Sequence, residues 1–238
     1  MPSENGATGN RILDALPKVS FDRLRRHFEP IVLPYRGIVQ QAGGEILHIT
    51  FPTSGVVSLM LPLHDGSVIE IGVIGNEGLV GLPALLDRVD SVHEAVVQGP
   101  GEALRVPTQV MRAELDNSSE VRTLVRRFAE LFLEQVSQTA ACNGLHTLEA
   151  RCARWLLTMR DRQGSDRFHL TQEFLAVLLG VQRTGVTAVA GSLQRKSLIE
   201  YRHGEIEILD PASLESQSCE CYRDLKGRLD TFLRDARP

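Results

Sequence analysis

The sequence predicts an α+β chain with an N-terminal β-barrel, a long central helix, and a C-terminal helical unit that ends in a β-hairpin. Three observations support this prediction. Short β-rich runs separated by turn residues fill residues 31–107, one long amphipathic segment follows, and two short amphipathic segments split by a glycine come later. With 238 residues, 42% hydrophobic and 24% charged, the chain has the composition of a globular protein and room for two small domains.

The N-terminal region is polar and then weakly helical. MPSENGATGN has no apolar core of a signal peptide, and no apolar run in the chain approaches the ~18 residues that a membrane span needs. We therefore expect a cytoplasmic protein with no membrane contact. Residues 12–30 read as short helical pieces, with Ser20 as a plausible N-cap.

The strand-like region predicts a barrel or a sandwich. Asp65-Gly66 separates two β-rich runs and is a strong hairpin signal, and Gly99-Pro100-Gly101 marks another turn. Four glycines at three-residue spacing could suggest a phosphate cradle, but no lysine or helix start follows them. We interpret Gly72, Gly75, Gly78 and Gly81 as barrel turns.

A helix of about 25 residues follows, capped by Ser118 or Ser119. Its apolar stripe continues in a 4-3 rhythm typical of a coiled-coil seam, and the alternative is a helix packed only on its own barrel. The predicted dimer seam is Leu124, Phe128, Leu131 and Gln135. The next amphipathic helix, LHTLEARCARWLLTMRDRQG, ends at Gly164.

Residues 170–199, LTQEFLAVLLGVQRTGVTAVAGSLQRKSLI, predict a helix-turn-helix unit. Thr171 is a suitable N-cap, Ala176 supplies the small residue where two helices cross, and Gly180 tolerates the left-handed backbone of the turn. The apolar residues fall where the two helices must pack: Leu175, Leu179, Val181, Val186 and Val189. SLIEYRHGEIEILD then predicts a β-hairpin, which would form a wing against a phosphate backbone.

The charge distribution favours this segment as the nucleic-acid contact. The net charge is −4, but residues 151–209 carry nine Arg/Lys against six Asp/Glu. The positive excess is small, so it supports the helix-turn-helix prediction but would not by itself indicate DNA binding.

The four cysteines predict neither a disulfide framework nor a metal site. Cys142 and Cys152 lie in helical pattern, where a thiol acts as a small hydrophobe. Cys219-Glu220-Cys221 is too tight for a relaxed disulfide, and the sequence shows no second pair to complete a tetrahedral zinc site. We expect reduced thiols, no metal and no cofactor.

Taken together, these segments resemble the Crp/Fnr family of bacterial transcription regulators. FPTSGVVSLM and GNEGLVGLPALL are similar to segments of that family's sensor barrel. The resemblance implies a cyclic-nucleotide-binding-like jelly-roll barrel (12–116), a dimerisation helix (117–144) and a winged helix-turn-helix domain (145–225). It also implies a homodimer on a two-fold symmetric operator in double-stranded DNA, with RNA polymerase as a further partner.

The sensor segment departs from the cyclic-AMP-binding pattern of that family. A Gly-Glu turn and a later Arg-Ser hold the nucleotide there; here the positions read Gly81-Leu82 and Val92-His93-Glu94. Cyclic AMP binding in the usual manner is therefore not expected, and Gly81, Leu82, Val92 and His93 mark the candidate pocket for an unknown effector. An iron-sulfur cluster is not expected without N-terminal cysteines, nor haem from the barrel histidines His48, His64 and His93.

The recognition helix also departs from the family's Ser-Arg-Glu-Thr-Val start. It reads Gln182-Arg183-Thr184-Gly185-Val186, so Arg183 keeps the place from which arginine reaches guanine, while Thr184 replaces a glutamate and Ala188 a second arginine. Close approach to DNA would explain Gly185. The predicted DNA-contacting set is Thr171, Gln182, Arg183, Thr184, Thr187, Ala188, Arg195 and Arg202.

Two other classes of function are possible. The first is a small-molecule-binding barrel whose winged domain contacts proteins; Lys196 and the arginines near one helix favour DNA, because protein interfaces tend to exclude lysine. The second is an enzyme, which we do not expect: no nucleophile elbow, P-loop or paired metal ligands stand out, and His146-x-x-Glu149 has no second copy.

Overall fold

The computed structural model describes residues 7–235. The chain begins with α1 (Arg11–Asp14), α2 (Lys18–Leu24) and the 3-10 turn η1 (Arg25–His27). Asn10 anchors this region because its buried side chain accepts hydrogen bonds from the N–H groups of Ile12 and Leu13 and donates to the carbonyl oxygens of Pro52 and Gly78. Ser20 is not an N-cap as predicted: α2 begins after Pro17, and Ser20 is buried inside it.

The barrel consists of two antiparallel sheets that enclose one apolar core. Their orders are β1-β7-β3 and β2-β6-β4-β5. The predicted hairpin at Asp65-Gly66 is confirmed, since β4 and β5 pair antiparallel on either side of it. The elements are β1 (Glu29–Leu33), β2 (Ile38–Gln40), β3 (His48–Pro52), β4 (Val56–Pro62), β5 (Val68–Ile74), η2 (Leu82–Leu86), β6 (Glu94–Gly99) and β7 (Gly101–Pro107).

Two helices follow the barrel, α3 (Thr108–Asn117) and α4 (Ser119–Leu145). Ser118 is the N-cap of α4, and its Oγ accepts a hydrogen bond from the N–H of Val121 at 3.3 Å. α4 lies against β5 and the loop after it, where a Cβ on Gly72 or Gly78 would come within 2.6 Å of an α4 side chain. These two glycines therefore allow the close approach of the helix. The prediction that Gly72 is a barrel turn is wrong, because it lies inside β5 and pairs with Leu59.

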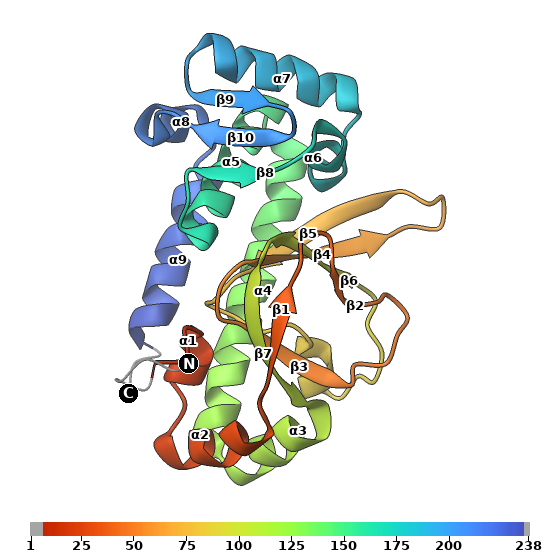
Figure 1. The fold of residues 1–238 in the computed structure, drawn as a ribbon, viewed down its shortest axis with the longest axis vertical. Helices are drawn as coiled ribbons and strands as arrows, with labels where there is room; N and C mark the ends of the chain where they lie inside the picture. Colours follow the sequence, from red (N-terminus) through yellow and green to blue (C-terminus); the bar gives the residue numbers. More distant parts are fainter. Residues whose placement is uncertain (1–6, 236–238) are drawn as a thin grey trace.

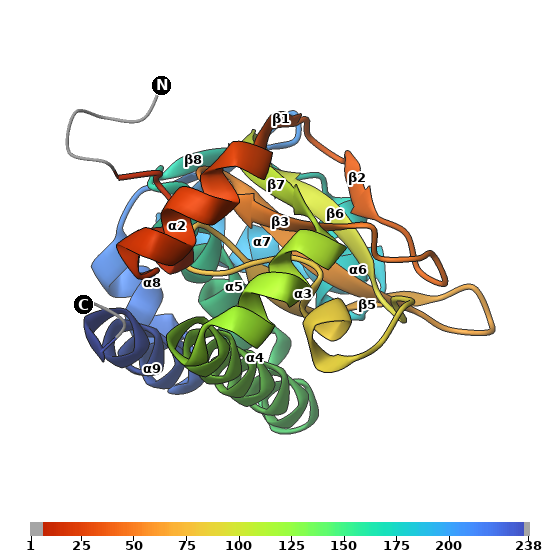
Figure 2. The same cartoon turned by 90° about the horizontal axis from the view of Figure 1, so that it is seen from below.

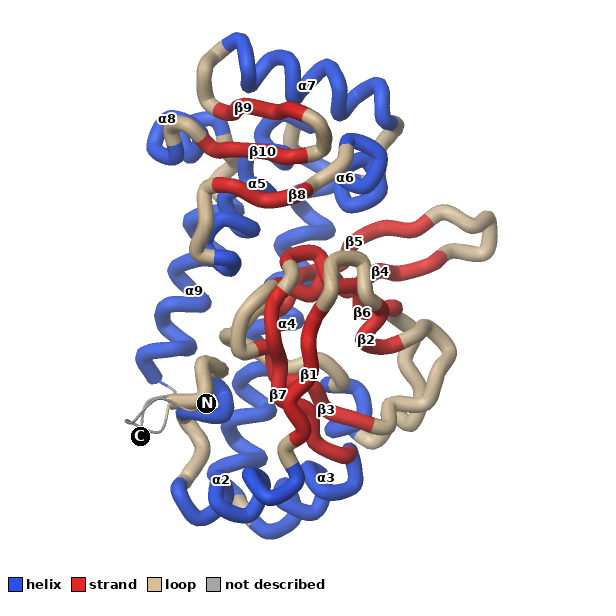
Figure 3. Tube along the Cα trace, viewed as in Figure 1, coloured by secondary structure: helices blue, strands red, loops and turns tan. Residues whose placement is uncertain are grey.

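The C-terminal domain packs its helices around a small sheet (Figure 3). Its elements are α5 (Leu148–Gln163), β8 (Arg167–His169), α6 (Gln172–Leu179), α7 (Arg183–Arg195), β9 (Ile199–Arg202), β10 (Glu205–Ile208) and α8 (Pro211–Gln217). Gly164 ends α5 in left-handed conformation, as predicted. The predicted wing hairpin is β9–β10, and β8 pairs with β10 as a third strand that the sequence did not reveal.

A last helix, α9 (Cys221–Asp235), runs back alongside α4 (Figures 1 and 2). Phe232 packs near Phe128 of α4, with ring centroids 6.4 Å apart, and Arg127 of α4 pairs with Asp235 at 3.1 Å. The expected domain end at 225 falls inside this helix, which had not been predicted. α9 therefore covers one side of α4 in the single chain.

The barrel and the C-terminal domain share one apolar core cluster, in which Val56 and Met60 of β4 join residues of α5 and α6. Buried Glu70 of β5 lies at this junction. Its carboxyl group accepts hydrogen bonds from Trp155 Nε1 at 2.8 Å and Ser58 Oγ at 2.5 Å. Burial raises the pKa of Glu70 to about 7, despite these donors and the nearby arginines.

Within residues 7–235 no single helix is long and apolar enough to cross a bilayer; α6 and α7 reach that length and composition only when taken together, across a 106° bend.

Candidate DNA-binding site

The α6–α7 unit has the geometry of a helix-turn-helix. Thr171 Oγ1 accepts a hydrogen bond from the N–H of Phe174 at 3.2 Å and caps α6, as predicted. Gly180 ends α6 with φ +63°, and the chain bends by 106° before α7. Ala176 is 5% exposed in the core where the helices meet. The structure thus confirms the predicted cap at Thr171, the left-handed turn at Gly180 and the small buried residue Ala176 at the helix crossing.

α7 turns its apolar side inward and its polar side to solvent. Val186, Ala190 and Leu193 are buried, and α7 lies at the end of the molecule farthest from the barrel (Figure 1). Its N-cap position, Gln182, and four residues of its first two turns form one open surface. The exposed residues are Gln182, Arg183, Thr184, Thr187 and Ala188.

Two of these side chains are already held in place by α6. Arg183 Nη1 pairs with Glu173 Oε1 at 2.7 Å, and Thr187 Oγ1 donates to Gln172 Oε1 at 2.7 Å. The arginine and its partner are 64% and 60% exposed, so exchanging this pair for a base edge costs little.

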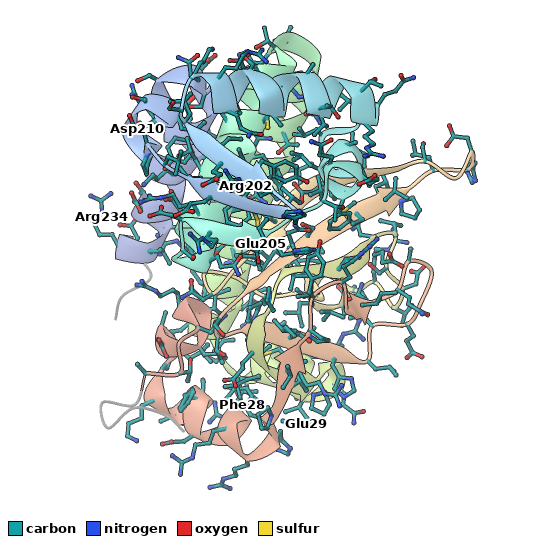
Figure 4. All side chains as sticks on the ribbon, turned by 45° about the horizontal axis from the view of Figure 1, so that its top comes forward. Phe28, Glu29, Arg202, Glu205, Asp210 and Arg234 are labelled. Atoms are coloured by element: carbon teal, nitrogen blue, oxygen red, sulfur yellow. The ribbon has the colours of Figure 1, made fainter. Side chains whose placement is uncertain are left out.

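The wing presents one further arginine to solvent. Arg202 lies opposite Glu205 in the β9–β10 hairpin (Figure 4), and His203 and Gly204, both with positive φ, make the turn between them. The Arg202 side chain is 78% exposed, and its Nε contacts Glu200 Oε1 at 2.7 Å. Arg195 is exposed at the end of α7.

The positive surface is smaller than the sequence count suggested. Arg151 and Arg154 are 8% and 7% exposed, so two of the nine basic residues face the interior. Lys196 pairs with Glu149 at 2.5 Å. Few basic side chains are therefore left on the α7 and wing surface, so each of them should contribute a larger share of any DNA contact.

Gly185 has a structural reason that the sequence did not reveal. A Cβ at this position would lie 3.1 Å from Leu148 Cδ2, where α5 begins. The residue is also partly buried. Close packing of α5 on α7 is thus one reason for the glycine, while its close approach to DNA stays a prediction.

The residues predicted as a dimer seam lie inside the single chain. Leu124 and Phe128 are 7% and 3% exposed and pack in the barrel core, with Leu131 partly buried against it. Gln135 Nε2 donates to the carbonyl oxygen of Val73 at 3.0 Å. The stripe faces the barrel and α9, so its assignment to the seam is wrong: the 4-3 rhythm reflected packing within the chain.

The candidate effector residues lie around η2 and before β6. Gly81 has φ +102°, and a Cβ there would meet Ile49 Cδ1 at 2.9 Å. Val92 is 44% exposed, and burial together with Arg88 lowers the pKa of His93. A cavity of about 350 Å³ lies elsewhere, between β5, α4, α5 and α9, and none of the four residues lines it.

The structure also joins residues that the sequence left apart. Cys142 and His146, at the end of α4, lie beside Cys219 and Cys221. The prediction that no second ligand pair accompanies Cys219 and Cys221 is wrong. The fold brings Cys142 and His146 to them from the other end of the domain.

Known proteins agree with this architecture. Residues 150–217 match the sequence profile of the Crp-like helix-turn-helix domain. No curated protein matches the chain in sequence. Solved structures of Crp/Fnr regulators are similar in fold at low sequence identity.

A transcriptional regulator of the Crp/Fnr family from Eubacterium rectale is 15% identical, with a TM-score of 0.72 over 89% of this chain and 99% of that one. FixK2 from Bradyrhizobium japonicum is 13% identical, with a TM-score of 0.69 over 81% and 98%. A Crp-family regulator from Thermus thermophilus is 21% identical, with a TM-score of 0.67 over 80% and 96%.

These three similarities concern the fold, while the profile match concerns the residues that form the helix-turn-helix unit. A Crp-like helix-turn-helix DNA-binding domain therefore stands here within a fold that most of the chain shares with solved Crp/Fnr regulators.

Proposed function

We propose that the chain acts as a homodimer that places two α7 helices in successive major grooves of a two-fold symmetric operator. The observation that carries this proposal is the open polar surface of α7, with Arg183 in its first turn and no other element of the described chain over it. Arginine in that position matches O6 and N7 of guanine. Arg202 on the wing supplies a phosphate contact.

The dimer seam lies on the face of α4 that the barrel and α9 leave open. Along that face apolar and small residues recur with 4-3 spacing, and Leu133 is 65% exposed in the single chain. A large exposed leucine between small side chains suits close pairing of two helices. The proposed seam is Ala129, Leu133, Val136 and Ala140.

The signal that controls binding differs from cyclic AMP bound in the usual manner. Leu82 stands where a ribose-binding glutamate would, and Glu94 would repel a phosphate. The regulator acts in the cytoplasm and contacts RNA polymerase at its promoters; the shared fold supports these two parts by analogy alone.

Selection of bound fragments from random double-stranded DNA tests the proposal. We expect enrichment of an inverted repeat with one dominant guanine per half-site and half-site centres about one helical turn, ~10 base pairs, apart. Enrichment of a lone half-site would contradict the homodimer. No enrichment, with and without cell extract, would contradict specific DNA binding.

A further inference from the structure

A cluster of three cysteines and one histidine joins the end of α4 to the start of α9. Cys142 lies in the last turn of α4 and His146 is its C-cap residue, so four-residue spacing puts both side chains on one side. Cys219 and Cys221 flank Glu220: Cys219 lies in the turn after α8, and Cys221 is the first residue of α9. The three thiols are buried, and His146 is only partly exposed.

The distances within this cluster suit a single tetrahedral ion. Cys142 Sγ lies 3.5 Å from Cys219 Sγ, Cys221 Sγ lies 3.5 Å from His146 Nδ1, and all four ligand atoms lie within 4.8 Å of one another. Metal–sulfur bonds of about 2.3 Å and metal–nitrogen bonds of about 2.0 Å would set tetrahedral ligands roughly 3.5–3.8 Å apart.

The surroundings of the cluster also match a metal site. His146 Nε2 lies 3.2 Å from Glu220 Oε1, so a carboxylate holds the ring nitrogen that would not bind the metal. Gln138 Nε2 donates to Cys221 Sγ at 3.0 Å. Both contacts orient ligand atoms towards the centre of the cluster.

Two buried arginines supply charge of the right sign. Arg151 and Arg154 are more than nine-tenths buried, and the Nε of each has no hydrogen-bond partner among the described residues. Both arginines lie close enough to the thiols of the cluster to interact with them electrostatically. Zn²⁺ with three thiolates and a neutral imidazole carries one net negative charge, which these cations would offset.

From this geometry we propose that Cys142, His146, Cys219 and Cys221 bind one structural Zn²⁺ ion. Four protein ligands complete the tetrahedron and leave no open position for a substrate, and thiolate with imidazole is a ligand set that favours zinc. The ion would fix α9 and the α8–α9 turn to the turn between α4 and α5. This site is independent of the way in which α7 reads DNA.

Metal analysis of the full chain, purified with reducing agent and without chelator, tests the proposal directly. We expect one zinc per chain. After chelator treatment, Co²⁺ should restore one ion per chain with the thiolate charge-transfer and d–d absorption bands of a tetrahedral site. Wild-type protein that holds no zinc and gives no such Co²⁺ spectrum would overturn the proposal, as would a Cys142–Cys219 disulfide or a coloured iron-sulfur centre.

Variants separate the cluster from general stability. Cys219→Ala should lose the ion, whereas Cys152→Ala, which alters a buried thiol outside the cluster, should retain it. His146→Cys should retain the ion with stronger charge-transfer absorption. Glu220 is a positioning residue with a 70% exposed side chain, so Glu220→Gln should fold normally and weaken zinc affinity about 10–100-fold. Two outcomes would overturn the assignment. In the first, Cys152→Ala loses as much metal as Cys219→Ala. In the second, Cys219→Ala loses no metal and Glu220→Gln binds zinc with unchanged affinity.

Discussion

Glu70 is a carboxyl group in an apolar junction, and its ionisation should affect stability. Its pKa of about 7 lies above the ordinary 4.5, so between these values the folded chain binds more protons than the unfolded chain. The free energy of unfolding should therefore fall as pH rises through that window, by at most about 3 kcal/mol, and the loss should be complete above it.

Urea unfolding at about pH 5 and about pH 8 measures this effect. Glu70→Gln keeps an oxygen to accept from Trp155 and puts an amide N–H beside Ser58 Oγ, which can accept from it; this variant should remove most of the decline. Glu130→Gln, on the exposed side of α4, should leave the decline as in wild type. If wild type and Glu70→Gln showed the same pH dependence of unfolding, the pKa of Glu70 would not be raised in the folded chain.

The sensor residues predict how the barrel responds to cyclic nucleotides. Leu82 stands in place of the ribose-binding glutamate, and Glu94 lies where the phosphate-binding arginine would. Calorimetry with cyclic AMP or cyclic GMP should therefore show no binding at sub-millimolar concentration. The turn at Gly81 also has little free space, since a Cβ added there would lie 2.9 Å from Ile49 Cδ1. A clear micromolar isotherm would contradict this prediction.

At single residues, the sequence was informative where the cause is local. Thr171 and Gly180 were predicted correctly because an N-cap and a left-handed turn depend on neighbours a few residues away. Ser20 was misread as an N-cap, since the start of α2 depends on Pro17. The packing of Gly185 was not visible in the sequence, since it depends on Leu148 of another helix.

At the scale of elements, α4 offers a direct test of the proposed dimer. Leu133→Glu would bury a charge in the seam, at a cost of several kcal/mol, so sedimentation should show a monomer. Leu63→Glu is the control because Leu63 is also exposed, at 49%, but follows β4. If Leu133→Glu sediments as the wild-type dimer does, the seam lies on another surface.

The length of α4 and its cap could be predicted from the sequence. Which part of the molecule its apolar stripe packs against could not. Periodicity shows that one face is buried and does not say by what. Here the barrel and α9 cover that face in the same chain. α9 itself was missed because its sequence is strongly polar, with Phe232 among its few buried residues.

For the whole molecule, the order of barrel, long helix and winged helix-turn-helix was predictable, because each part has its own periodicity and turn signals. Contacts between distant segments were not. Glu70 meets Trp155 across 85 residues, and Cys142 meets Cys219 across 77. No local pattern encodes such pairs, so both the buried carboxyl group and the proposed zinc site emerged only from the fold.

In the proposed complex, α7 reads base sequence while the wing holds the phosphate backbone. A binding titration at several salt concentrations, on the selected operator and on single-base variants, compares Arg183→Ala with Arg202→Ala. Arg183→Ala should lose ~1–3 kcal/mol only on sites that keep the guanine, and should relax preference at one position per half-site.

Arg202→Ala should weaken all sequences alike and reduce the salt slope by roughly one unit for each phosphate that the wing no longer neutralises. These two results together would support base reading by α7 and phosphate contact by the wing. The opposite pattern, with Arg183→Ala weakening every sequence equally and Arg202→Ala changing base preference, would contradict it.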